Sequence, residues 1–170
     1  MEMVVIIVVM SLAIPVLMTM WSNVAWRSAR SETMTDAVFY GQELMEEIKS
    51  KRFDEKIAFP WTNSSNLTTD SGENSNNKAT FDDIDDFVNA TDPLVTAPAP
   101  NYIRSVNVSY VLLNSTNVWQ PCSLPVTCSS PSVTDCSSCS QCCYKAITVI
   151  TARTDNPLEN VTLNTIISGR

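Results

Sequence analysis

Hydrophobic and polar positions divide the chain into three parts. Residues 3–20 are apolar apart from Ser11 and Thr19, and a helix needs roughly 20 apolar residues to cross a membrane. Apolar residues then recur at helical spacing among charged ones, which predicts an amphipathic helix that continues the first. Its apolar stripe consists of Met34, Ala37, Val38, Gly41, Leu44, Met45 and Ile48. The pattern therefore predicts about 50 residues of nearly continuous helix.

Pro15 lies inside the apolar part of this predicted helix. Proline removes one backbone hydrogen bond and clashes with the preceding turn, so we expect a kink at this position. A membrane helix tolerates such a defect when its neighbours satisfy the freed carbonyl group.

The C-terminal part shows the alternation of half-buried strands. Apolar residues occupy every second position in residues 102–112, and further strands are predicted for 144–153 and 161–167. Residues 61–79 have no apolar periodicity and are predicted to form a loop. Two or three adjacent antiparallel strands result, and the helical stripe covers their apolar face. The predicted fold class is α+β, with a long kinked N-terminal α-helix whose second half packs on a small antiparallel β-sheet head.

All the cysteines lie in one short segment of the chain. An even number of cysteines close together in sequence predicts disulfides if the protein is exported to an oxidising compartment, and metal binding if it stays in a reducing one. The hydrophobic N-terminus favours export, so we predict a disulfide-rich loop over residues 120–143; zinc or an iron–sulfur cluster is the alternative. The pairing stays open among about 15 connectivities. The predicted disulfide residues are Cys122, Cys128, Cys136, Cys139, Cys142 and Cys143.

These patterns predict three regions. Residues 1–26 form a membrane or filament-core helix, residues 27–55 the amphipathic half of the same helix, and residues 56–170 a globular β head that includes the cysteine-rich loop. The head also contains sequons for N-glycosylation, which favour a solvated exterior. The glycosylation candidates are Asn63, Asn66, Asn89, Asn107, Asn114 and Asn160.

Composition excludes several classes of function. The chain has no histidine, so mechanisms that use imidazole as a base or metal ligand are excluded. A net charge of −7 and a pI near 4.4 argue against nucleic acid as a partner, because phosphate requires basic patches. We therefore predict neither catalysis nor a required cofactor.

A cluster of acidic residues precedes the first predicted strand, and it permits two interpretations. Carboxylates close together in sequence suit calcium, which prefers hard oxygen ligands. A solvated acidic turn is the alternative, because the cluster lacks the spacing of a twelve-residue calcium loop. The same residues are weak evidence for acid–base catalysis. The calcium candidates are Asp82, Asp83, Asp85 and Asp86.

The N-terminal residues carry a family resemblance. The sequence of residues 2–15, in which an acid heads an apolar helix that contains a proline, resembles the start of type IV pilins and pseudopilins. Residues 42–55 and 81–87 are similar to bacterial chains with prepilin-type N-termini. The family glutamate is normally the fifth residue of the mature chain, whereas Glu2 is second here. The resemblance implies a helix-on-sheet head, N-terminal methylation, and roles for Glu2 and Pro15 in assembly.

The expected function is a structural subunit, or pilin, of an extracellular type IV pilus-like filament. The expected partners are further copies of the chain in a helical homopolymer, the inner membrane before assembly, and the pilus assembly machinery. Such fimbriae lie on the cell surface and serve cell adhesion. Two alternatives are a pseudopilin of a type II secretion system and a membrane-anchored extracellular binding domain that does not polymerise.

Overall fold

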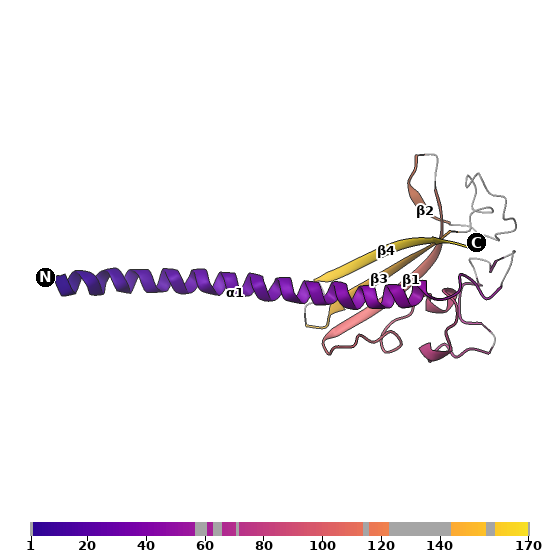
Figure 1. Cartoon of the computed structure of the whole chain (residues 1–170), viewed down its shortest axis with the longest axis horizontal. Helices are drawn as coiled ribbons and strands as arrows, with labels where there is room; N and C mark the ends of the chain where they lie inside the picture. Colours follow the sequence, from indigo (N-terminus) through magenta and orange to yellow (C-terminus); the bar gives the residue numbers. More distant parts are fainter. Residues whose placement is uncertain are drawn as a thin grey trace. The chain divides into compact units, whose positions relative to one another are not determined.

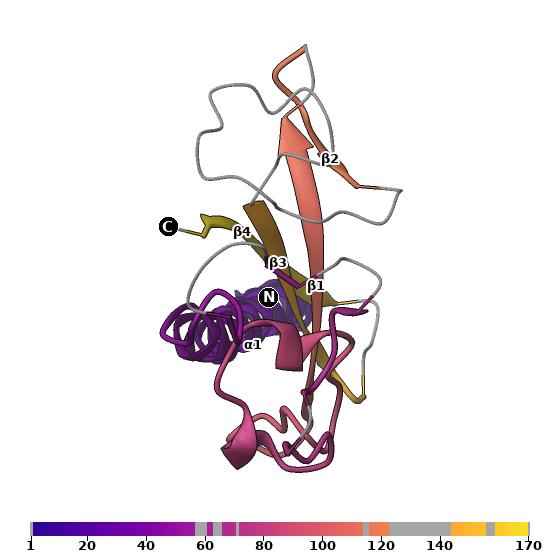
Figure 2. The ribbon, with the colours of Figure 1, turned by 90° about the vertical axis from the view of Figure 1, so that its right-hand side faces the viewer.

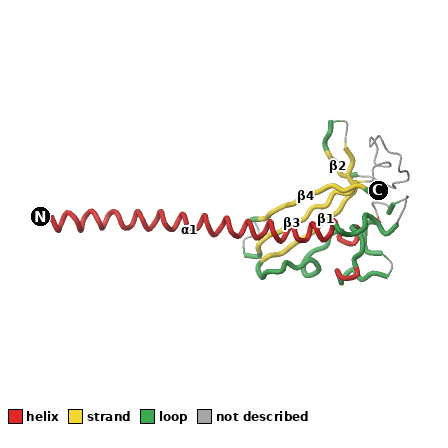
Figure 3. Tube along the Cα trace, viewed as in Figure 1, coloured by secondary structure: helices red, strands yellow, loops and turns green. Residues whose placement is uncertain are grey.

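The computed structural model describes residues 2–56, 61–62, 66–70, 72–113, 116–122, 144–155 and 159–169. These residues form one long helix, two short 3-10 helices and a four-stranded sheet (Figures 1 and 3). The elements are α1 (Glu2–Lys49), η2 (Lys78–Thr80), η3 (Asp85–Phe87), β1 (Tyr102–Leu113), β2 (Trp119–Pro121), β3 (Tyr144–Arg153) and β4 (Asn160–Ser168). The α+β class is confirmed.

The chain divides into two compact units, Met1–Asp36 and Ala37–Arg170. In the first unit, α1 runs without interruption through Pro15, and Figure 1 shows no visible bend in its N-terminal part. The expected kink is therefore not observed. The proline ring removes the N–H of one residue only, and the intrahelical bonds on either side hold the helix. The hydroxyls of Ser11 and Thr19 donate to carbonyl groups three residues earlier, both at 2.8 Å.

In the second unit, the last turns of α1 bury the predicted stripe. Its buried members are Ala37, Gly41, Leu44, Met45 and Ile48. Met34 and Val38 are half-buried, and Phe39, which lies off the stripe, is 65% exposed. This one-sided burial is what an amphipathic helix packed on a sheet requires.

The sheet is antiparallel throughout, with the strand order β2-β1-β3-β4. In its centre, Val106 of β1 pairs with Val149 of β3, which pairs with Leu163 of β4. The three predicted strands are confirmed within one residue at each end. Strand β2 was not predicted, because three residues are too short to show an alternation.

One hydrophobic core joins the helix to the sheet. Leu44 and Ile48 of α1 are fully buried against Val108 and Ile147, and Figure 2 shows the last turns of α1 beside the sheet. The approach is close: a Cβ on Gly41 would lie 3.0 Å from Leu163 Cδ1. The loop between α1 and β1 adds aromatic and aliphatic side chains to the same core. They are Phe81, Ile84, Phe87 and Val95.

Candidate functional site

The apolar surface of α1 is the first candidate site. Large hydrophobic side chains from Met3 to Val24 are at least 51% exposed, and Glu2 is the only ionisable side chain before Arg27. The helix is long and apolar enough to cross a membrane. Of the two predicted assembly residues, Glu2 is exposed in the first turn of α1, and Pro15 lies inside the helix.

The second candidate is the acidic region between α1 and β1. Helix α1 ends at Lys49, and a bridge joins Arg52, three residues further on, to Asp83. The Arg52 N–H donates to the Asp82 carbonyl at 3.3 Å, and its carbonyl accepts from the Ile84 N–H at 3.1 Å. This bridge joins the acidic segment to the residues that directly follow the helix.

Burial distinguishes the four predicted calcium residues. Asp83 and Asp85 are each 2% exposed and Asp86 is 5% exposed, whereas Asp82 is exposed. A solvated acidic turn therefore describes Asp82 alone. The other three are buried because the apolar residues between and around them enter the core and carry the acids with them. These apolar residues are Phe81, Ile84 and Phe87.

Backbone hydrogen bonds orient two of the buried carboxylates. Asp83 Oδ1 accepts the N–H groups of Asp85 at 2.8 Å and Asp86 at 3.3 Å. Asp86 Oδ2 accepts those of Asp82 at 3.0 Å and Asp83 at 3.1 Å. One oxygen of Asp83 therefore stabilises the turn that carries Asp86, and one oxygen of Asp86 stabilises the turn that carries Asp83.

Asp85 has a different environment from Asp83 and Asp86. It forms an ion pair with the ammonium group of Lys145, which is fully buried and also lies 3.6 Å from Asp54 Oδ2. Burial raises the pKa of Asp85 to about 7, although Lys145 acts in the opposite direction. Asp85 is thus the partner of a lysine rather than a free metal ligand.

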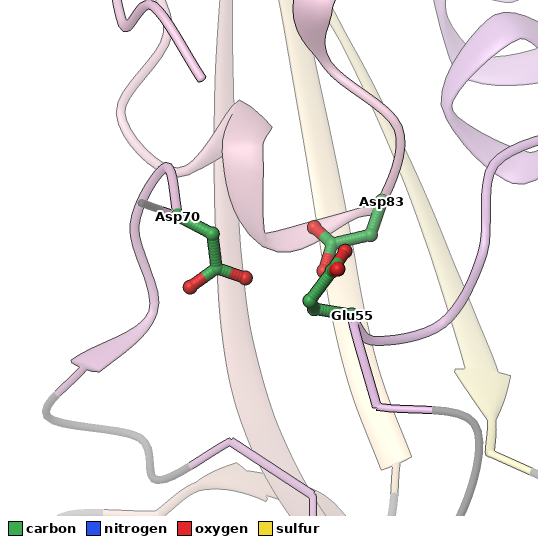
Figure 4. A group of neighbouring side chains, drawn as sticks. All are labelled: Glu55, Asp70 and Asp83. Atoms are coloured by element: carbon green, nitrogen blue, oxygen red, sulfur yellow. The ribbon is translucent and has the colours of Figure 1, made fainter. Parts of the chain in front are cut away.

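Two groups of carboxylates in this region have oxygens within 4.8 Å of one another. The first carboxylate triad consists of Glu55, Asp70 and Asp83, and Figure 4 shows the carboxylates of Glu55 and Asp83 facing one another. The second carboxylate triad consists of Glu73, Asp82 and Asp86. A pocket of about 310 Å³ lies beside Asp86.

Sequence reasoning missed half of these carboxylates. Glu55 lies at the end of a predicted helix, and Asp70 and Glu73 lie in a predicted loop. All three are 10 or more residues from Asp83 in sequence. No local pattern marked them, since only tertiary contacts bring them to the acidic cluster.

Most predicted cysteine positions lie outside the described residues. Cys122 is half-buried and packs against the cluster of Trp61 and Tyr110; its N–H donates to the Tyr110 carbonyl at 2.9 Å. The other five predicted disulfide residues fall within 123–143, which the structure does not describe. The disulfide-rich loop therefore stays a prediction.

The sequons that can be located are at the surface. The described asparagines are all exposed: Asn66, Asn89, Asn107 and Asn160. Asn63 and Asn114 lie outside the described residues. Exposure meets one requirement for glycosylation, and the modification itself stays a prediction.

Comparisons of the chain with models of protein families, with curated proteins and with solved structures each find no match.

Proposed function

We propose that the chain is a pilin-like structural subunit of an extracellular filament and that it assembles through its N-terminal helix. The observation that carries this proposal is the contrast in burial along α1. Large apolar side chains from Met3 to Val24 are exposed, whereas the stripe that begins at Ala37 is buried under the sheet. A helix of this kind requires a second apolar environment for its N-terminal part.

Two environments meet that requirement. Lipid covers an apolar helix, and a bundle of like helices covers it equally well. Apolar burial contributes about 25 cal/mol per Å² whenever such a surface would otherwise face water. A subunit stored in the membrane and then transferred into a helical bundle never exposes this surface to water. The heads would then lie on the outside of the filament.

Glu2 is the residue most specific to this proposal. An acid at the centre of a membrane costs about 2.5–3.5 kcal/mol on insertion scales, and a partner or a hydrated headgroup region reduces that cost. In a filament, the N-terminal amine of an adjacent subunit provides such a partner and sets the axial register. If Glu2 only lies at the headgroup level, its charge has no role in assembly.

The head supplies the outer surface in this proposal. Oxidation of the cysteines would staple the Ser- and Pro-rich segment between β2 and β3, which has too few apolar residues to form its own core. The exposed sequons would carry any glycan cover. These features support an extracellular location and are independent of the assembly step.

The test compares Glu2→Gln with Glu32→Gln, an exposed acid on the same helix beyond the apolar segment. Both full-length variants are produced in cells that contain the assembly machinery, and surface fibres are sheared off, imaged and identified by mass spectrometry. We expect Glu2→Gln to reduce fibre yield about tenfold or more, which corresponds to about 1.4 kcal/mol. Glu32→Gln should leave the yield unchanged.

Other outcomes would contradict the filament proposal. A wild-type chain that stays wholly in the membrane fraction, without sheared fibres, would indicate an anchored binding domain. A short assembly confined to the cell envelope would indicate a pseudopilin. Normal fibre yield from Glu2→Gln would show that Glu2 does not set the axial register. The proposal would then depend on the hydrophobic helix alone.

A further inference from the structure

The first carboxylate triad contains a buried oxygen without a hydrogen-bond partner. Asp83 is 2% exposed, and its Oδ1 is occupied by two backbone N–H groups. Its Oδ2 has no partner among the described residues, and the carboxylate faces that of Glu55 (Figure 4). A buried carboxylate oxygen without a partner is costly, so this geometry calls for a ligand that is not part of the polypeptide.

The basic residues of the region do not meet this need. Lys145 is engaged by Asp85 and Asp54 on the other side of the cluster. Arg52 forms ion pairs with Glu55 and Asp82 at the surface. Asp83 itself forms no ion pair within the described part of the chain. Its negative charge is therefore compensated only at a distance.

The partners of the exposed acids distinguish the two triads. The second carboxylate triad also holds a buried oxygen, Asp86 Oδ1, without a partner among the described residues. Both of its other acids are engaged, since Asp82 pairs with Arg52 and Glu73 Oε2 accepts the Asp70 N–H at 3.1 Å. Of the two exposed acids of the first triad, only Glu55 is paired, with Arg52, in the described part of the chain, so the first triad is more open to a metal ion.

We propose that the first carboxylate triad binds a calcium ion, with Asp83 as the buried ligand and Glu55 and Asp70 as the more exposed ligands. Their oxygens already lie within 4.8 Å of one another, a separation that a shared ion at about 2.3–2.6 Å from each oxygen can bridge. Glu55 and Asp70 come from the segment between α1 and η2, and Asp83 comes from the segment between η2 and η3.

Calcium suits this arrangement better than other common metal ions. Three carboxylates from separate segments form an irregular, incomplete shell, and calcium accepts irregular geometry with water and carbonyl oxygens as additional ligands. Magnesium requires a near-octahedral shell and loses water reluctantly. Zinc prefers nitrogen and sulfur ligands, which this triad lacks.

The experiment uses the full chain in detergent micelles, stripped with EDTA and transferred to chelator-free buffer at pH 7.5. Calcium chloride and, separately, magnesium chloride are titrated in a calorimeter, and thermal unfolding is followed with and without each salt. We expect calcium to bind with a Kd at or below about 1 mM and to raise the unfolding temperature. Magnesium should bind at least about tenfold more weakly.

Two variants test the proposed ligands, and a third serves as the control. Asp83→Asn keeps an Oδ1 that accepts the backbone N–H groups, and Glu55→Gln changes an exposed side chain, so neither removes a structural contact of the core. Both should weaken calcium binding about tenfold or more. Asp155→Asn, an exposed acid at the far end of β3, is the control and should bind like the wild type.

Two results would overturn the proposal. One is the absence of calcium binding by the folded wild-type chain at millimolar concentration. The other is wild-type affinity in both Asp83→Asn and Glu55→Gln, which would assign any calcium binding to other acids of the chain. Loss of folding in Asp83→Asn alone leaves Glu55→Gln to decide the question.

Discussion

Lys145 is a fully buried lysine whose neighbours offset the cost of its charge. Its ammonium group forms an ion pair with Asp85, donates to the Phe53 carbonyl at 2.5 Å and lies 4.3 Å from the centre of the Phe53 ring. Asp54 lies at 3.6 Å. Buried charges are tolerated only with such complete pairing. The pair also links β3 to η3.

We predict that Lys145→Met destabilises the head by about 3–5 kcal/mol, because it leaves Asp85 and Asp54 buried without their cation. Urea unfolding of the full chain in detergent, followed by tryptophan fluorescence, measures the change. Arg153→Met is the matched control on the same strand, since Arg153 pairs with Asp155 at the surface and its loss should change stability little. Equal losses of stability in the two variants would show that the buried ion pair contributes no more to stability than the surface pair.

At the scale of elements, the contact of α1 with the sheet depends on the absence of a side chain at one position. A Cβ on Gly41 would lie 3.0 Å from Leu163 Cδ1 and 3.1 Å from Thr151 Oγ1. Glycine inside a helix costs about 1 kcal/mol relative to alanine. The close approach of helix and sheet accounts for a glycine at this position.

We predict that Gly41→Leu destabilises the head by about 1–3 kcal/mol or more, because the added side chain has no space between α1 and β4. Gly41→Ala should have a smaller effect, since the gain in helix propensity opposes a mild steric conflict. Gln42→Leu, at the next and exposed position, serves as the control. The free energy of unfolding in urea measures all three, and a neutral Gly41→Leu would contradict the observed packing.

The elements themselves could be predicted because their periodicity is strong. The stripe from Ala37 to Ile48 and the alternation in β1 and β3 each specify one buried face. The acidic cluster shows where this reasoning ends. Its sequence is polar, yet Phe81, Ile84 and Phe87 draw three of its acids into the core. The pairing of Asp85 with Lys145 spans 60 residues, and no local pattern encodes such a contact.

For the whole molecule, three buried acids make stability depend on pH. Burial is the main cause of the raised pKa of Asp83, Asp85 and Asp86, to about 6, 7 and 8. In the unfolded chain these groups ionise near pH 4. Between pH 4 and 8 the folded state therefore holds more protons than the unfolded state. Charged groups from several elements face these acids: Lys145, Asp54, Arg52, Glu55, Asp70, Glu73 and Asp82.

We predict that the metal-free chain becomes less stable as the pH rises from about 5 to 8, because unfolding then releases protons that the buried acids retain in the folded state. Thermal unfolding in EDTA across this range measures the effect. With calcium, the loss between about pH 5 and 6 should be smaller, since the ion replaces the proton at Asp83. Stability that increases with pH in EDTA would contradict the prediction.

We also predict that the six cysteines form three disulfides within the chain. The intact mass after alkylation without reductant should then equal the sequence mass less one hydrogen per cysteine, apart from any glycan or methyl group. Alkylation after reduction should modify every cysteine and provides the internal control. Uptake of the reagent by the unreduced, EDTA-treated chain would instead indicate thiols or a metal site.

The strand order has a consequence for the time course of folding. Strands β1 and β2 are neighbours in both sequence and space, as are β3 and β4, whereas the central pairing of β1 with β3 closes over a long segment. Local hairpins form fast and non-local pairings form slowly. Helix α1 is synthesised first, so the apolar stripe that the folded head buries stays exposed until the two hairpins pair. That interval is when the nascent chain is most open to aggregation.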